Sequence, residues 1–137
     1  MTTERASRAV PGSALALIAQ ARLVLAEATM AWDPGERFRL AHLAALRAAA
    51  AVLADRGRPA GARRRLMSVW VLLDAIAPEL RDWSRYFAAG APVRAAVEAG
   101  ARSAVSRRAA DDQLRSAEEF LLAIERSLGM LAAPLAS

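Results

Sequence analysis

The sequence predicts an all-α protein, an up-and-down bundle of four long helices and one short helix. Two observations predict this fold. Apolar residues recur at steps of three and four over several segments, which places them along one face of a helix, and glycine or proline stands where these segments end. No segment shows the apolar–polar alternation of a strand or an Asn-Gly hairpin turn.

A chain of 137 residues has the size of one domain. We expect the bundle to occupy residues 13–128. A flexible N-terminal arm, residues 1–12, precedes it, and a flexible C-terminal tail, residues 129–137, follows it.

The first helix is expected over residues 13–32, with Ser13 as its N-cap and an apolar stripe that runs from Leu17 to Trp32. Polar side chains interrupt the apolar segment 14–31, so we do not expect it to cross a membrane. No apolar segment precedes it that would form a signal peptide, and the chain is therefore expected in the cytoplasm. The interrupting residues are Gln20, Arg22 and Glu27.

The second helix is expected over residues 34–56. Asp33 can cap it, Pro34 suits the first helical position, and Glu36 stands at the capping-box position. Gly57 ends it. Almost no polar face remains on this helix, so we expect it at the centre of the bundle, where its many alanines allow neighbouring helices to approach closely.

A third helical region starts near Leu66 and keeps its apolar stripe through Pro78, which predicts either one kinked helix or two collinear helices. Pro92 then separates it from a short helix expected over residues 93–99, which ends at Gly100.

The last helix is expected to begin after Ser103 or Ser106 and to continue to Leu128, with Gly129 as its stop.

The residue types exclude several chemistries. Without cysteine the chain has no thiol nucleophile, no cysteine zinc site, no iron–sulfur cluster and no disulfide. Di-metal helical bundles need Glu-x-x-His pairs, which are absent, so we expect neither a metal nor a cofactor. The carboxylates of the last helix are expected to form a hydrated face; they are Asp111, Asp112, Glu118 and Glu119.

All 19 basic residues are arginine, and the formal net charge is +5. Five of them cluster in a segment rich in glycine and proline that we expect to be an exposed loop. Their guanidinium groups can form bidentate hydrogen bonds with phosphate oxygens. A solvated loop without a ligand, in a chain whose basic residues are all arginine, explains the cluster as well. The candidate phosphate-binding residues are Arg56, Arg58, Arg63, Arg64 and Arg65, joined by Arg107 and Arg108 if these face the same surface.

His42 is the one conventional acid–base residue with an ordinary pKa near neutrality. It stands at the edge of the apolar ridge of the second helix, where a histidine serves most often as a hydrogen-bonded packing residue. Arg37 precedes it by little more than one helical turn, and the two are the only catalytic candidates.

The order of these segments resembles a known family. The alanine-rich helix from Glu36 to Gly57, the basic loop that follows it, and the helix from Ala110 to Leu128 resemble the HEPN domain (higher eukaryotes and prokaryotes nucleotide-binding), over about residues 13–128. The resemblance implies a helical bundle that often dimerises and that handles nucleotides or RNA. Catalytic members are metal-independent RNases with an arginine, a polar residue and, a few positions later, a histidine.

Arg37 and His42 match that spacing, but Phe38 stands where the family has a polar residue, and the pair lies in the second helix instead of a later one. We therefore interpret the chain as a non-catalytic HEPN-like interaction module. It is expected to form a homodimer through apolar helix faces and to offer its arginines to an RNA, a nucleotide or an acidic protein. Two alternatives stay open: an RNase in which His42 is the general base and Arg37 stabilises the phosphorane, and a purely structural helical subunit.

Overall fold

The structure is a computed structural model that describes residues 9–57 and 68–130. Every regular element in these two ranges is helical, so the predicted all-α fold is confirmed, with four long helices and one short one. The elements are α2 (Gly12–Met30), α3 (Pro34–Arg56), α4 (Val69–Ile76), η2 (Pro78–Leu80), α5 (Arg81–Glu98), η3 (Arg102–Ala104) and α6 (Arg107–Ser127), where η marks a single 3₁₀ turn.

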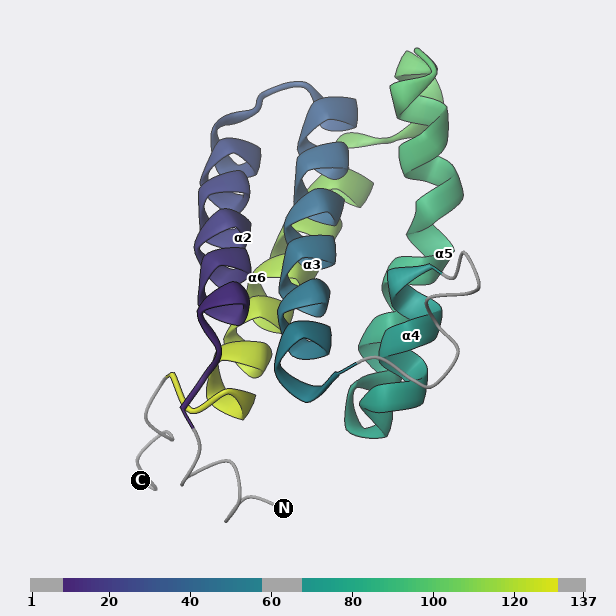
Figure 1. Ribbon diagram of the computed structural model, residues 1–137. Helices are drawn as coiled ribbons and strands as arrows, with labels where there is room; N and C mark the ends of the chain where they lie inside the picture. The colour runs from purple at the N-terminus through teal and green to yellow at the C-terminus, as the bar shows by residue number, and fades with distance from the viewer. Residues whose placement is uncertain (1–8, 58–67, 131–137) are drawn as a thin grey trace, which may run out of the picture.

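Helix α3 lies at the centre of the molecule, as its nearly continuous apolar surface predicts. Figure 1 shows α2 and α6 on one side of it and α4 and α5 on the other, and α3 packs against all four. Six of its eight alanines are buried, which brings the neighbouring backbones close. The main core therefore surrounds α3, and its largest buried side chains are Phe87 and Phe120.

Both ends of α3 form as the sequence predicts. The Asp33 carboxylate accepts a hydrogen bond of 2.9 Å from the Glu36 backbone N–H, and Pro34 occupies the first turn. The capping box stays half formed, because the Glu36 carboxylate accepts two hydrogen bonds from Arg39 instead. Gly57 ends the helix with a φ of +91°, a conformation that favours glycine.

The first helix differs from its prediction at both ends. It begins at Gly12, so Ser13 lies inside it, and Pro11 takes the N-cap position without a side-chain hydrogen bond. Val10 packs against the core, so at least one residue of the predicted arm belongs to the bundle. At the other end the helix stops at Met30, which leaves Trp32 outside it and exposed instead of in the core stripe. Residues 1–8 of the arm and 131–137 of the tail lie outside the described residues.

The prediction of a short helix over residues 93–99 is wrong. Helix α5 runs without a break through Pro92 to Glu98. Val93 and Val97 pack against a second apolar cluster around Phe38, and this tertiary packing holds the helix together although proline removes one backbone donor. Gly100 ends the helix with a φ of +95°.

The short helix is α4, and it is not collinear with α5. The two helices pack against each other, because the chain turns back through η2, which opens at Pro78. Ser68 caps α4 by accepting a hydrogen bond from the Val71 N–H at 3.2 Å. The predicted start near Leu66 lies outside the described residues.

The last helix agrees with its prediction. Ser106 is the N-cap and accepts a hydrogen bond of 3.0 Å from the Ala109 N–H. At the other end the N–H groups of Gly129 and Met130 donate back into the helix at 3.0 and 2.8 Å, which is the Schellman motif of a helix stopped by glycine.

Candidate functional site

His42 lies in the protein interior. Its side chain is 1% exposed, and its Nε2 donates a hydrogen bond of 3.0 Å to the Phe87 carbonyl on α5. The imidazole meets the rings of Trp70 and Phe87 edge-on, with centroids 5.7 and 6.3 Å apart. It is therefore placed as a packing residue that joins α3 to α4 and α5.

The surroundings of His42 favour the neutral imidazole. Burial lowers its pKa, the Phe87 carbonyl opposes that shift, and the nearby charges of Arg94 and Glu98 act in opposite directions. Because a carbonyl can only accept, the proton stands on Nε2, and Nδ1 has no hydrogen-bond partner among the described residues. An imidazole enclosed in this way has no open path to a polynucleotide.

Arg37 has a different set of contacts. Its Nε donates to the Ala31 carbonyl at 2.9 Å and its Nη1 to the Asp111 carboxylate at 2.5 Å. These bonds tie the α2–α3 turn to the first turns of α6. The hydrogen bonds of Arg37 and His42 go to different residues, on the α2–α3 turn and α6 for Arg37 and on α5 for His42, and no hydrogen bond joins these two described side chains.

The candidate phosphate-binding arginines do not form one surface in the described part of the chain. Arg56 is the last residue of α3, and it binds the Glu79 carboxylate and the Ser127 hydroxyl. Arg107 and Arg108 are exposed at the opposite end of α6, a helix of 21 residues that spans roughly 30 Å. The other candidates, Arg58, Arg63, Arg64 and Arg65, lie outside the described residues.

A partly buried ion pair that the sequence did not indicate positions α2. Arg22 donates two hydrogen bonds to the carboxylate of Glu125 on α6, one of them from Nε at 2.8 Å. The two residues are 103 positions apart, so no local pattern marks them as partners. Glu125 is buried whereas Arg22 is half exposed, and the pair fixes the register of α2 along α6.

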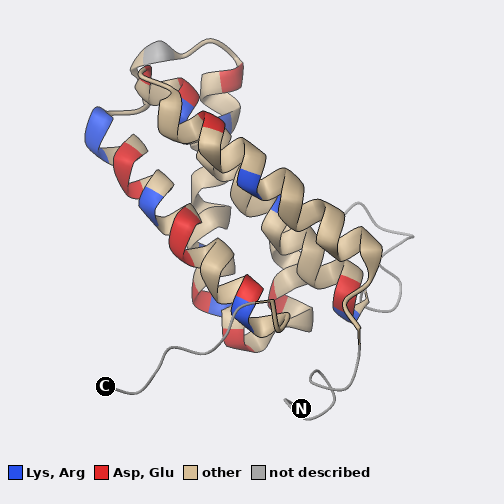
Figure 2. Ribbon diagram, turned by 90° about the vertical axis from the view of Figure 1, so that its left-hand side faces the viewer, with Lys and Arg blue, Asp and Glu red and all other residues tan. Residues whose placement is uncertain are grey.

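The side of α2 that points away from α3 is also apolar. We call this surface the outer face of α2. Its exposed residues recur at steps of four and three, and Leu23 and Met30 are 69% and 83% exposed. Figure 2 shows α2 as a band with few charges beside the alternating acidic and basic residues of α6. The outer face consists of Leu15, Ala19, Leu23, Ala26 and Met30.

By its length and composition alone, α2 could cross a membrane, because apolar residues lie on two of its sides. It is the only such helix in residues 9–57 and 68–130. A core helix passes the same test. In this fold the inner side of α2 packs on α3, and Arg22 reaches the Glu125 carboxylate.

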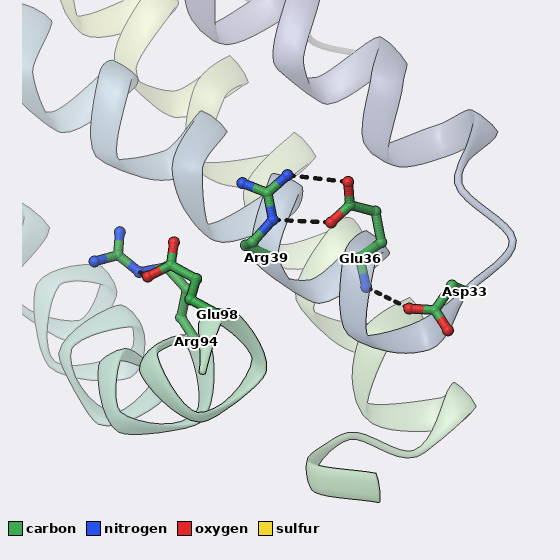
Figure 3. Close-up of polar contacts among 5 residues, drawn as sticks. All are labelled: Asp33, Glu36, Arg39, Arg94 and Glu98. Carbon is green, nitrogen blue, oxygen red and sulfur yellow. Dashed lines mark hydrogen bonds and ion pairs between the residues drawn. The ribbon is translucent and has the colours of Figure 1, made fainter. Parts of the chain in front are cut away.

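A shallow pocket lies between the α2–α3 turn and the C-terminal end of α5, with a volume of about 440 Å³. Figure 3 shows the hydrogen bonds that join Asp33, Glu36 and Arg39 at the start of α3, and Arg94 beside Glu98 on α5; of these residues, Asp33 and Glu36 line the pocket. The hydrogen bonds from Arg39 lower the pKa of Glu36, so this carboxylate stays charged. Residues that line the pocket include Trp32, Asp33, Gly35, Glu36, Val97 and Gly100.

The all-α fold of the described residues agrees with that of HEPN domains, which are all-α. A family model for SAV_6107-like HEPN domains matches residues 28–125, which is most of the chain. The chain therefore belongs to the SAV_6107-like HEPN family. No curated protein and no solved structure matches it.

Proposed function

We propose that this chain is a non-catalytic HEPN interaction module that pairs with a second copy through the outer face of α2. One observation carries the proposal: a continuous apolar stripe, led by Leu23 and Met30, stands exposed along an edge helix. Apolar stripes of this length are costly to leave in water and are typical of helix pairing.

The flanks of the stripe favour a second copy as the partner. Leu23 and Met30 are seven residues apart, as in a coiled-coil seam, and Ala26 lies between them. Arg22 and Glu27 border the stripe on opposite sides. A two-fold axis parallel to α2 brings Arg22 of one copy beside Glu27 of the other, so the same surface complements itself in charge.

The interior supports binding over catalysis. His42 is enclosed by Trp70 and Phe87, and Arg37 is held by Asp111. Neither side chain presents a reactive group at the outer face of α2.

Light scattering coupled to gel filtration tests the pairing. We expect the wild type to have twice the monomer mass of 14.6 kDa. Leu23→Glu places a charge in the seam and is expected to weaken pairing at least about tenfold. Val71→Glu is the matched control, because Val71 is an exposed residue of α4, 52% exposed, on the other side of α3. A monomeric wild type, or equal masses for both variants, contradicts the proposal.

Binding of RNA or a nucleotide is a second candidate function. Arg107 and Arg108 are exposed in the first turn of α6 and pair with no described carboxylate, and a helix N-terminus also favours anions. A mobility shift with mixed RNA should strengthen as salt falls and weaken in the Arg107→Ala, Arg108→Ala double variant. Arg81→Ala, which removes an arginine held by Asp74, is the control. The absence of a shift even at low salt removes this candidate.

The same RNA samples test the RNase alternative. An RNase of this family type predicts cleavage that survives chelators and disappears in His42→Ala. Intact RNA after incubation with the wild type excludes that activity.

A further inference from the structure

The geometry points to the pocket beside Trp32 as a binding site for a guanidinium group, the side chain of an arginine on a partner protein. This inference does not rest on the pairing of α2. It rests on an exposed aromatic ring, two carboxylates and a wall of small residues that meet at one place.

Trp32 supplies an aromatic surface that the fold does not use. Its side chain is 81% exposed, and none of the ring–ring contacts among the described aromatic residues involves it. Trp70, in contrast, lies in the core and is 4% exposed. An indole face attracts a cation, and a planar guanidinium can also stack on it.

The carboxylates give the pocket the sign that a cation needs. Asp33 uses Oδ2 for the helix cap, and its Oδ1 forms no hydrogen bond with a described residue. Glu36 also lines the pocket, and its charge is shared with Arg39. Because Arg39 compensates Glu36, the negative charge of the pocket is that of Asp33, and it exceeds the partial positive charge of the α3 N-terminus, which amounts to about half an elementary charge. The pocket is thus acidic in a chain whose formal net charge is +5.

Gly35 allows the Asp33 carboxylate and Val97 of α5 to lie close to the start of α3. A Cβ atom at Gly35 would lie 3.3 Å from the Asp33 carboxylate and 3.3 Å from a Val97 methyl group, closer than ordinary van der Waals contact. A side chain at this position would therefore require the Asp33 or Val97 side chain to shift by a few tenths of an ångström. In the inferred complex, the planar guanidinium lies on the Trp32 ring and turns its N–H groups to the carboxylate of Asp33, since both residues line the pocket.

The test is a titration of the full chain with the peptide acetyl-Gly-Arg-Gly-amide, followed by the indole N–H signals of the three tryptophans. We expect a saturable shift of the Trp32 signal with little change at Trp70 and Trp83. The same peptide with citrulline, which is neutral, and with lysine, which is not planar, should bind more weakly. Equal binding of either control peptide, or no saturable shift, overturns the inference.

Two variants connect the binding to its residues. Trp32→Ala and Asp33→Asn are each expected to weaken binding about two- to fivefold. Because Trp32→Ala lacks the indole N–H signal, binding to this variant is followed by the backbone N–H signals of Gly35 and Val97. Asparagine is as good an N-cap as aspartate, so Asp33→Asn removes charge and keeps the start of α3. Asp82→Asn, an exposed carboxylate in the first turn of α5, is the control. Unchanged affinity in both variants overturns the inference. Repeating the titration in the Leu23→Glu variant separates it from α2 pairing, because the pocket should bind the peptide equally well there.

Discussion

Arg22 and Glu125 join the first and last helices through two hydrogen bonds to one buried carboxylate. Breaking a buried pair from one side is expensive, because the remaining charge is left without a partner. Arg22→Ala is therefore expected to lower the free energy of unfolding by about 3 kcal/mol, at the lower end of the range for buried pairs because the arginine is half exposed. Urea denaturation measures the change. Arg39→Ala, which breaks the exposed pair with Glu36, is the comparison and should cost only about 0.5 kcal/mol.

The buried imidazole predicts how stability depends on pH. Burial lowers the pKa of His42 below its ordinary value of 6.5, so in the window between the two values the unfolded chain binds more protons than the folded one. The contribution of this group is fully present above pH 6.5 and is lost as the pH falls toward the lowered value. Urea midpoints measured from about pH 8 down to about pH 5 should decrease below neutrality.

His42→Gln removes the group and should flatten that decrease while lowering stability at every pH. Because His42 is the only histidine, no other imidazole contributes to the step. An unchanged pH profile in this variant would contradict the assignment.

Gly90 offers a stabilising substitution. It lies inside α5, and a Cβ atom there would meet Phe38 at 3.4 Å and His42 at 3.6 Å, which is ordinary contact. Gly90→Ala is expected to raise the unfolding free energy by about 0.5–1 kcal/mol, because alanine reduces the freedom of the unfolded chain. Gly100→Ala should have the opposite effect, since Gly100 has a φ of +95°. Thermal melts of the two variants should shift in opposite directions.

The contribution of the Asp33 hydrogen bond to stability can be measured separately from that of the Asp33 charge. Asp33→Ala removes the acceptor of the Glu36 N–H and is expected to destabilise the protein by about 1 kcal/mol. Asp33→Asn keeps the acceptor and should change stability by a few tenths of a kcal/mol at most. Equal losses in the two variants would show that charge, not the hydrogen bond, holds the start of the helix.

Local signals predicted the parts of the fold that depend on neighbouring residues. The bounds of α3 follow from Asp33, Pro34 and Gly57, and the end of α6 follows from Gly129, because caps and left-handed glycines act within a few residues. The break expected at Pro92 failed for the converse reason: contacts of Val93 with a distant cluster override the local preference.

The candidate site was harder to predict than the fold. The enclosure of His42 depends on Trp70 and Phe87, which come from two later helices. The outer face of α2 carried a readable signal, a second apolar stripe opposite the first, but only the packing shows which stripe is covered. Trp32 was assigned to the core stripe, because the sequence does not show that the helix stops at Met30.

The fully buried side chains of α2 are mostly small, and the larger Leu17, Val24 and Leu25 pack against the core while only partly buried. Ala14, Ala21 and Ala28 are fully buried at intervals of seven, and Ile18 is the one large residue among the buried positions of this helix. Fewer large apolar side chains are buried on α2 than on α3 or α6, so detaching α2 is expected to expose less apolar area to water. Native-state hydrogen exchange should therefore show the amides of α2 opening below the global unfolding free energy, before those of α3. A helix that detaches first is also the element most easily exchanged between two copies by domain swapping.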